Sequence, residues 1–260
     1  MKTLALPYAI ATAISTSMIS TLATADTTAA EQDSLQLDVV TVSADFRDAD
    51  VQELPEAVTV IGADNIALRS AEHLESVLSF APNVNFSSGS SRGRYFQIRG
   101  IGERSQFVDP VNPSVGLMID GIDMTGLGGA ATLFDVQQVE VLRGPQGTRF
   151  GANALAGMIN IQTKAATKET EGYIAGKFGN YNTHGQSGAI SGSIAENVQG
   201  RLAVNSFQSE GYMENKYLDE SNTNNLDEVV ARGKIQWQPD SDSEFRLTYL
   251  LVDVDNGYDA

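Results

Sequence analysis

A regular alternation of apolar and polar residues in the second half of the chain constrains its fold more than any other feature. Five segments of roughly ten residues show this pattern, and short polar turns separate them. Successive side chains of a β-strand point to opposite faces, so the pattern predicts antiparallel strands with one apolar and one polar face. Barrel strands that cross a membrane have this pattern, and so do the strands of a soluble antiparallel sandwich. The apolar positions are Ile174, Phe178, Ile190, Ile194, Leu202, Val204, Ile235, Trp237, Phe245, Leu247, Tyr249 and Leu251.

Residues 1–25 have the composition of a secretory signal peptide. Lys2 precedes an apolar run, and Ala23-Thr24-Ala25 matches the small-residue cleavage signature. We therefore predict cleavage before Asp26. An N-terminal membrane anchor is the alternative, but serines and threonines interrupt the apolar run. Since no other stretch of the sequence is apolar enough for a transmembrane helix, any membrane insertion of the mature chain must use β-strands.

Charge and residue usage exclude several classes of function. The chain has 33 acidic and 17 basic residues and a formal net charge of −16, so we expect no nucleic acid partner. It has no cysteine, which excludes disulfides, thiolate zinc sites and cysteine nucleophiles. The two histidines, His73 and His184, lack metal-ligand spacing. Residues 144–151 lack the Lys-Ser/Thr pair of a phosphate-binding loop, so we predict neither an enzyme nor a cofactor.

Residues 26–44 form a polar tail with one island of strand-forming residues. The tail is rich in small and polar residues and has too few large apolar side chains to fold by itself. The β-branched residues of the island favour an extended conformation, which makes it a candidate for pairing with another sheet. The island consists of Asp38, Val39, Val40, Thr41, Val42 and Ser43.

Residues 45–164 mix short helix and strand signals, which predicts a compact α+β domain. One helix is expected to start at residues 62–64 and a second to cover residues 71–80, where Pro82 ends it. One expected strand lies within residues 115–121 and runs into the Asp120-Gly121 turn, and two more lie at 139–142 and 158–163.

Five short motifs of this domain follow one another in a fixed order. They are Leu54-Pro55-Glu56-Ala57-Val58-Thr59-Val60-Ile61, Gln97-Ile98-Arg99-Gly100-Ile101-Gly102, Met118-Ile119-Asp120-Gly121-Ile122, Val139-Glu140-Val141-Leu142-Arg143-Gly144-Pro145-Gln146-Gly147 and Gly157-Met158-Ile159-Asn160-Ile161. Their order and spacing resemble the plug domain of TonB-dependent receptors, although Phe150 and Met158 stand where the family more often has other residues. The resemblance implies an α+β plug domain followed by the first antiparallel strands of a transmembrane β-barrel (incomplete), located in the cell outer membrane.

The resemblance also implies a function and partners. It implies active uptake of a scarce solute, energised by TonB and its inner-membrane complex, by a barrel surrounded by outer-membrane lipid. A ferric siderophore or another iron complex is the expected solute, and an oligosaccharide, cobalamin or an aromatic solute is the alternative. The island at residues 38–43 resembles the family's Ton box, which adds a strand to a TonB sheet.

Two groups of site residues follow from the same resemblance. The apical plug loops correspond to residues 87–95 and 124–129, where two cations and an aromatic ring suit an anionic or catecholate iron chelate; a Ser/Gly loop without a ligand role is the alternative. Arg99 and Arg143 would pair with barrel glutamates to lock the plug, or form salt bridges within the plug. The expected solute contacts are Ser91, Arg92, Arg94, Tyr95, Met124, Thr125 and Leu127.

The end of the chain suggests a second interpretation. A charged linker at residues 165–171 leads into residues 172–260, which we assign to a partial barrel of about five strands. This number is below the roughly eight strands of the smallest barrels, and the last residues lack the terminal aromatic that completed barrels of this kind usually carry. The alternative is therefore a truncated, non-transporting fragment whose plug only folds or binds in the periplasm.

Overall fold

The computed structural model describes residues 41–42, 49–50, 57–105, 107–217 and 219–257, which belong to one compact unit. The predicted signal peptide and residues 26–40 of the tail lie outside the described residues. Along the described chain, a mixed α+β region that ends with a strand at Thr163 is followed by a sheet of long strands that starts at Glu171.

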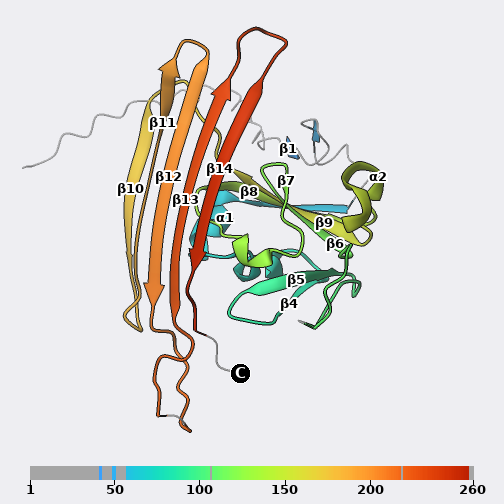
Figure 1. The fold of residues 1–260 in the computed structure, drawn as a ribbon, viewed down its shortest axis with the longest axis vertical. Helices are drawn as coiled ribbons and strands as arrows, with labels where there is room; N and C mark the ends of the chain where they lie inside the picture. Colours follow the sequence, from blue (N-terminus) through green and yellow to red (C-terminus); the bar gives the residue numbers. More distant parts are fainter. Residues whose placement is uncertain (1–40, 43–48, 51–56, 106, 218, 258–260) are drawn as a thin grey trace, which may run out of the picture. The chain divides into compact units, whose positions relative to one another are not determined.

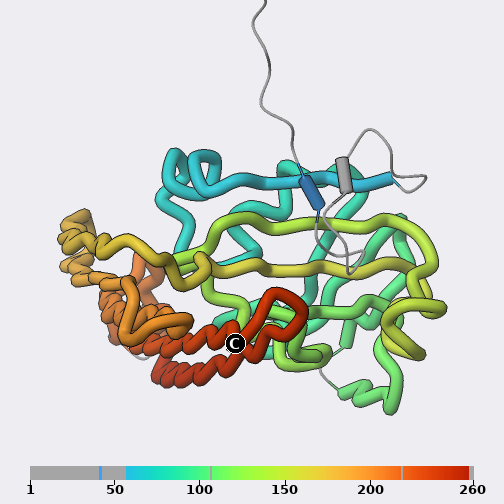
Figure 2. The backbone as a smooth tube through the Cα atoms, turned by 90° about the horizontal axis from the view of Figure 1, so that it is seen from above, coloured from blue at the N-terminus to red at the C-terminus, as the bar shows by residue number. Residues whose placement is uncertain are grey.

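A five-stranded sheet forms the centre of the α+β region. Its strands are β3 (Ala57–Gly62), β6 (Val115–Ile119), β7 (Ile122–Asp123), β8 (Val136–Arg143) and β9 (Gly157–Thr163). They are arranged in the order β3-β8-β9-β6-β7, and only β6 and β9 are parallel neighbours. Figure 2 shows β3, β8 and β9 side by side as cyan, yellow-green and yellow tubes. The strands expected near residues 115, 139 and 158 are thus confirmed.

The predicted Asp-Gly turn joins β6 to β7. Asp120 has a φ of 50° and Gly121 a φ of 81°. A two-residue hairpin turn of this kind needs positive φ at both central residues, which glycine adopts freely and aspartate tolerates. A second hairpin, of β4 (Val84–Ser88) and β5 (Gly93–Ile98), was not predicted.

Short helices connect these strands. Helix α1 (Ala63–Leu68) starts where the sequence predicts, but the helix expected at residues 71–80 is wrong. Two 3₁₀ turns, η2 (Leu74–Ser76) and η3 (Leu78–Phe80), replace it, because the backbone of residues 72–74 is hydrogen-bonded to that of residues 131–133. The remaining short elements are η4 (Gly128–Ala130), α2 (Gly147–Phe150) and η5 (Gly151–Asn153).

Apolar side chains of the central sheet, α1 and the 3₁₀ turns share one core. Burying each large apolar side chain contributes roughly 1.5–3 kcal/mol. The core therefore lets the α+β region position the loops that leave its strands. Its buried members include Ile61, Ile66, Leu74, Val77, Leu78, Phe96, Ile98, Leu117, Val139, Val141, Ile159 and Ile161.

The second half of the described chain forms one antiparallel sheet of long strands. They are β10 (Glu171–Phe178), β11 (His184–Ala195), β12 (Val198–Ser209), β13 (Leu226–Trp237) and β14 (Phe245–Val254). Each strand pairs with the next in chain order, as the long yellow to red arrows of Figure 1 show. The five predicted alternating segments are confirmed as these five strands. None of the described helices is long and apolar enough to span a membrane.

The two faces of this sheet differ in polarity, as the alternation predicts. On β12, Leu202 and Val204 are exposed while Arg201 is buried, and on β13 Ile235 is exposed while Arg232 is buried. We call the face with the exposed apolar side chains the outward face and the other the inward face. Buried charges on the inward face require partners, and the α+β region supplies them.

Candidate functional site

The best-formed contact between the two regions is an ion pair on the inward face. Arg201 on β12 donates to Asp135 through Nε at 2.8 Å and Nη2 at 2.6 Å, a two-pronged arrangement. The side chains are only 4% and 1% exposed. Asp135 lies directly before β8 at a φ of 55°, a conformation that aspartate tolerates better than most residues. This pair joins the central sheet of the α+β region to β12.

Three more cations of the inward face contact the α+β region. Lys234 on β13 lies 3.0 Å from Asp120, the aspartate of the β6–β7 turn. Arg232 donates to the backbone carbonyl of Phe134 at 2.9 Å. On β10, Lys177 pairs with the carboxylate of Glu72. The cations of the strands thus meet carboxylates or a carbonyl of the α+β region.

The fifth contact has the opposite polarity and involves a predicted solute residue. Arg92 donates through Nε to Glu228 of β13 at 2.6 Å, and its Nη1 lies 3.1 Å from Glu75. The side chains of Arg92 and Glu228 are 9% and 4% exposed. The guanidinium of Arg92 therefore faces two carboxylates. The structure places Arg92 between the two regions rather than on the exposed loops.

The two arginines expected to lock the domain lie elsewhere. Arg99 is exposed at a φ of 54°, and its backbone N–H donates to the carbonyl of Asn83. Arg143, at the end of β8, is half-buried, and its Nε has no hydrogen-bond partner among the described residues. Their predicted pairing with barrel glutamates stays a prediction.

Arg94 and Tyr95 of β5 lie beside the other predicted solute loop. Arg94 donates to Asp109 at 3.0 Å and its guanidinium carbon lies 4.9 Å from the centre of the Tyr95 ring. Tyr95 donates its hydroxyl to the same carboxylate at 2.9 Å. Burial, together with this hydrogen bond, raises the pKa of the Tyr95 phenol, so the group stays protonated. Nε of Arg94 also approaches the carbonyl of Gly126 at 3.4 Å.

The remaining predicted solute residues have different exposures. Leu127 is exposed, whereas Met124 and Ser91 are half-buried, and Met124 packs against the core. The hydroxyl of Thr125 accepts the backbone N–H of Leu117, so Thr125 fixes the loop to β6. Leu127 is therefore the most exposed of these residues.

Sequence reasoning missed a third loop, at residues 103–113. Its described part contains three exposed apolar side chains, Phe107, Val108 and Val111. The same loop supplies Asp109, which binds both Arg94 and Tyr95. The sequence did contain a signal for this loop, because its three apolar residues lie among polar residues and two prolines. We use the term loop surface for Arg94, Tyr95, Leu127 and the described residues of 103–113.

Part of the predicted TonB-binding island contacts the α+β region. Thr41 and Val42 form β1 (Thr41–Val42), which pairs with β2 (Ala49–Asp50). Val42 is fully buried in a small apolar cluster with Leu142, Ala154 and Met158, and Nε2 of Gln138 donates to the Thr41 carbonyl at 3.0 Å. The other island residues, Asp38 to Val40 and Ser43, lie outside the described residues.

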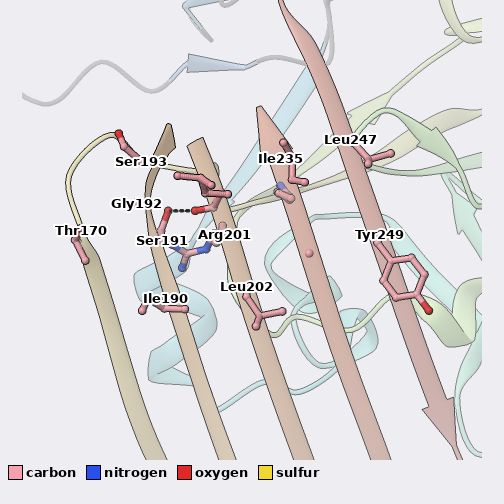
Figure 3. A pocket seen from close by; sticks show the side chains of 14 residues that line it. Thr170, Ile190, Ser191, Gly192, Ser193, Arg201, Leu202, Ile235, Leu247 and Tyr249 are labelled. Atoms are coloured by element: carbon pink, nitrogen blue, oxygen red, sulfur yellow. Dashed lines mark hydrogen bonds between the residues drawn. The ribbon is translucent and has the colours of Figure 1, made fainter. Parts of the chain in front are cut away.

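An apolar groove of about 470 Å³ lies on the outward face of the long-stranded sheet. Ile190, Leu202, Ile235, Leu247 and Tyr249 line it, as Figure 3 shows. Arg201 and Lys234 also belong to its lining, but both pair with carboxylates of the α+β region. Among the described residues, no group of three or more His, Cys, Asp or Glu side chains is arranged to hold a metal ion.

Comparison with known proteins identifies the α+β region. Residues 50–158 match the family model of the TonB-dependent receptor plug domain. The pesticin receptor of Yersinia enterocolitica is 29% identical over 177 residues, 68% of this chain and 26% of that receptor. The ferric enterobactin receptor of Pseudomonas aeruginosa is 31% identical over 168 residues, 57% of this chain and 22% of that receptor. The chain thus spans about a quarter of the length of the curated relatives it matches.

Solved structures agree with this assignment. The ferric yersiniabactin uptake receptor of Yersinia pestis is similar with a TM-score of 0.62 and 26% identity, covering 72% of this chain and 29% of that one. The pyoverdine receptor of Pseudomonas aeruginosa, with a TM-score of 0.64 and 20% identity, shares the fold. These relatives are receptors rather than enzymes. Residues 50–158 thus form a TonB-dependent receptor plug domain, and the antiparallel strands that follow match the first strands of the barrel in these similar receptors.

Proposed function

We propose that the chain is part of an outer-membrane receptor that takes up an iron chelate with energy supplied through TonB. The names of two relatives support the cargo, because one is a ferric enterobactin receptor and another a ferric yersiniabactin uptake receptor. The family supports the mode of transport, since TonB-dependent receptors are named for their dependence on TonB.

The observation that carries the choice of cargo is the loop surface. Arg94 presents a partly exposed cation stacked on the Tyr95 ring, next to the exposed apolar side chains of Phe107, Val111 and Leu127. A cation beside apolar and aromatic groups suits an anionic chelate with aromatic donor groups. A neutral oligosaccharide would gain nothing from the charge of Arg94.

Energy would reach the plug through residues 38–43, which we propose as the TonB-binding segment. TonB would add a strand to this segment. Val42 is buried against Met158 and Leu142, so a pull on the segment would act directly on β8 and β9.

The proposed location is the outer membrane, with export by a signal peptide cleaved after residue 25. The exposed apolar side chains of the outward face would contact lipid there. We propose the tail at 26–44, the plug at 45–164, a linker at 165–171 and barrel strands from 172 onward.

The test is ferric chelate binding by the membrane-assembled receptor that contains this chain. Ferric enterobactin and ferric yersiniabactin serve as probes. Arg94→Gln should weaken the binding of whichever chelate binds more tightly by about tenfold, because one charge-assisted contact is lost. Arg69→Gln is the matched control, because Arg69 also stacks on an aromatic ring, that of Phe80 at 4.3 Å, away from the loop surface. Failure of the unmodified receptor to bind either probe would contradict the proposed cargo.

A further inference from the structure

Glu75 lies in η2 and binds the start of β5. Its carboxylate accepts the backbone N–H of Gly93 at 2.7 Å and the guanidinium of Arg92 at 3.1 Å. Gly93 begins β5, the strand that contains Arg94 and Tyr95. Glu75 therefore fixes the start of the strand that presents the cation of the loop surface.

His73 connects the same carboxylate to the second solute loop. Its Nε2 donates to the carbonyl of Gly128 at 3.0 Å, and its Nδ1 faces Oε2 of Glu75 at 3.6 Å. Gly128 follows Leu127 and packs against β5 so closely that a Cβ atom there would lie 2.4 Å from the carbonyl oxygen of Gly93. The two loops are therefore in direct backbone contact, and His73 and Glu75 lie behind them.

Arg92 extends this network to the barrel. It bridges Glu75 and Glu228 of β13, and the amide of Asn256, which follows β14, donates to Glu228 at 2.7 Å. A buried arginine between two carboxylates depends on both, because an unpaired buried charge is costly. Glu75 is therefore required for the Arg92 contact with the barrel as well as for the loops.

The charge state of Glu75 agrees with this role. Burial alone would raise the pKa of its carboxyl, but His73, the amide of Gly93 and the charge of Arg92 more than offset it and lower the pKa from 4.5 to about 2. The carboxylate is thus ionised over the whole physiological range.

We propose that Glu75 is a positioning residue for solute binding, which holds the loops of Arg94 and Leu127 in one arrangement and joins them through Arg92 to Glu228. This role rests on the proposed uptake function. It assigns no contact with the solute to Glu75 or to Arg92. The loss of Glu75 should weaken solute affinity without changing the maximal rate of uptake.

Hydrogen exchange in the membrane-assembled receptor tests the geometry without any solute. Glu75→Gln keeps the shape of the side chain but removes its charge, so amides of residues 88–93 and 126–130 should exchange about tenfold faster. Amides of β8 and β9 should be unchanged. Glu72→Gln is the matched control, because Glu72 pairs with Lys177 of the barrel but touches neither loop, and both loops should keep their protection.

Uptake kinetics supply the second readout. With ferric enterobactin and ferric yersiniabactin, Glu75→Gln should raise the half-saturating concentration about tenfold at an unchanged maximal rate. Unchanged loop protection, or faster exchange that extends equally to β8 and β9, would overturn the proposal. If the Glu75→Gln receptor does not assemble, Arg92→Lys takes its place as the test variant. Its cation cannot bridge both carboxylates, so amides of the same two loops should exchange faster. A receptor that binds neither chelate would contradict the proposed cargo alone, since the exchange measurement still decides the role of Glu75.

Discussion

Replacing Asp135 with asparagine removes the charge that Arg201 of β12 needs while preserving the shape of the side chain. Asparagine also tolerates the φ of 55° at this position, so the backbone has no reason to change. Arg201 would keep only Glu171, whose Oε1 lies 3.3 Å from Nη1, as a charged partner. Removing one partner of a buried pair costs about 3–5 kcal/mol of stability. Because the contact with Glu171 remains, we expect a loss at the lower end of this range, about 3 kcal/mol.

The chain offers a matched control for this variant. Arg246 and Glu244 form the same two-pronged geometry, at 2.7 Å and 2.8 Å, but the side chain of Arg246 is 75% exposed. Exposed pairs contribute about 0–1 kcal/mol, so Arg246→Gln should have little effect. The comparison separates the effect of burial from that of hydrogen-bond geometry.

The assay is hydrogen exchange of β8 amides in the assembled receptor, because β8 starts directly after Asp135 and reports local opening of the plug. Asp135→Asn should accelerate this exchange about a hundredfold, in line with the free energy above. Combining it with Arg201→Gln should restore much of the protection, since no unpaired charge remains. The reasoning is refuted if β8 amides exchange as slowly in Asp135→Asn as in Arg246→Gln. It is also refuted if they exchange faster in the double variant than in Asp135→Asn alone.

Three further predictions concern coupling, pH and packing. Val40→Pro in the receptor should abolish chelate uptake but leave chelate binding intact, because proline cannot donate to a TonB strand; normal uptake would show that residues 38–43 are not the coupling segment. The pKa of Glu75 is lowered from 4.5 to about 2, so its carboxylate stabilises the folded receptor fully above pH 4.5 and loses this effect as the pH falls towards 2. The loss amounts to about 2 kcal/mol after a discount for partial exposure. Thermal denaturation should therefore show a stability gap between the unmodified receptor and Glu75→Gln that closes over this range, and a constant gap would contradict the assignment. Gly128→Ala should loosen the two solute loops by about 1–3 kcal/mol in hydrogen exchange, because its Cβ atom would collide with backbone, whereas Gly129→Ala meets nothing within 4 Å and should be neutral.

The long strands were predictable because their signal is local. Each alternates between a polar inward face and an apolar outward face, so a period of two residues is visible in any one of them. The hairpin of β4 and β5 was missed because Ser and Gly dominate the connection at residues 88–93, and the segment was interpreted as a loop. The helix expected at residues 71–80 failed because its first residues pair with residues 131–133, a contact that no local pattern reveals.

The sites were less predictable than the fold because their partners are far apart in sequence. Arg92 was expected on the solute surface from its neighbours Arg94 and Tyr95, but Glu228 lies 136 residues further along the chain. Arg94 lies beside loop 124–127, yet Asp109, which orients it, belongs to a loop without any recognised motif. Local chemistry therefore did not indicate which arginine faces outward, and the solute contacts themselves stay predictions.

The contacts between plug and barrel strands include several buried charges, and these charges have an energetic consequence. An apolar interface of similar size would be at least as stable, since desolvation offsets most of the attraction within a buried pair. Ion pairs such as Asp135–Arg201 and Asp120–Lys234 instead require one register, because a displaced plug would leave each charge unpaired. Water entering the interface would lower that penalty by solvating the separated charges. In the proposed transport cycle, a pull on residues 38–43 would therefore meet strong resistance while the interface is dry and much weaker resistance once water enters it.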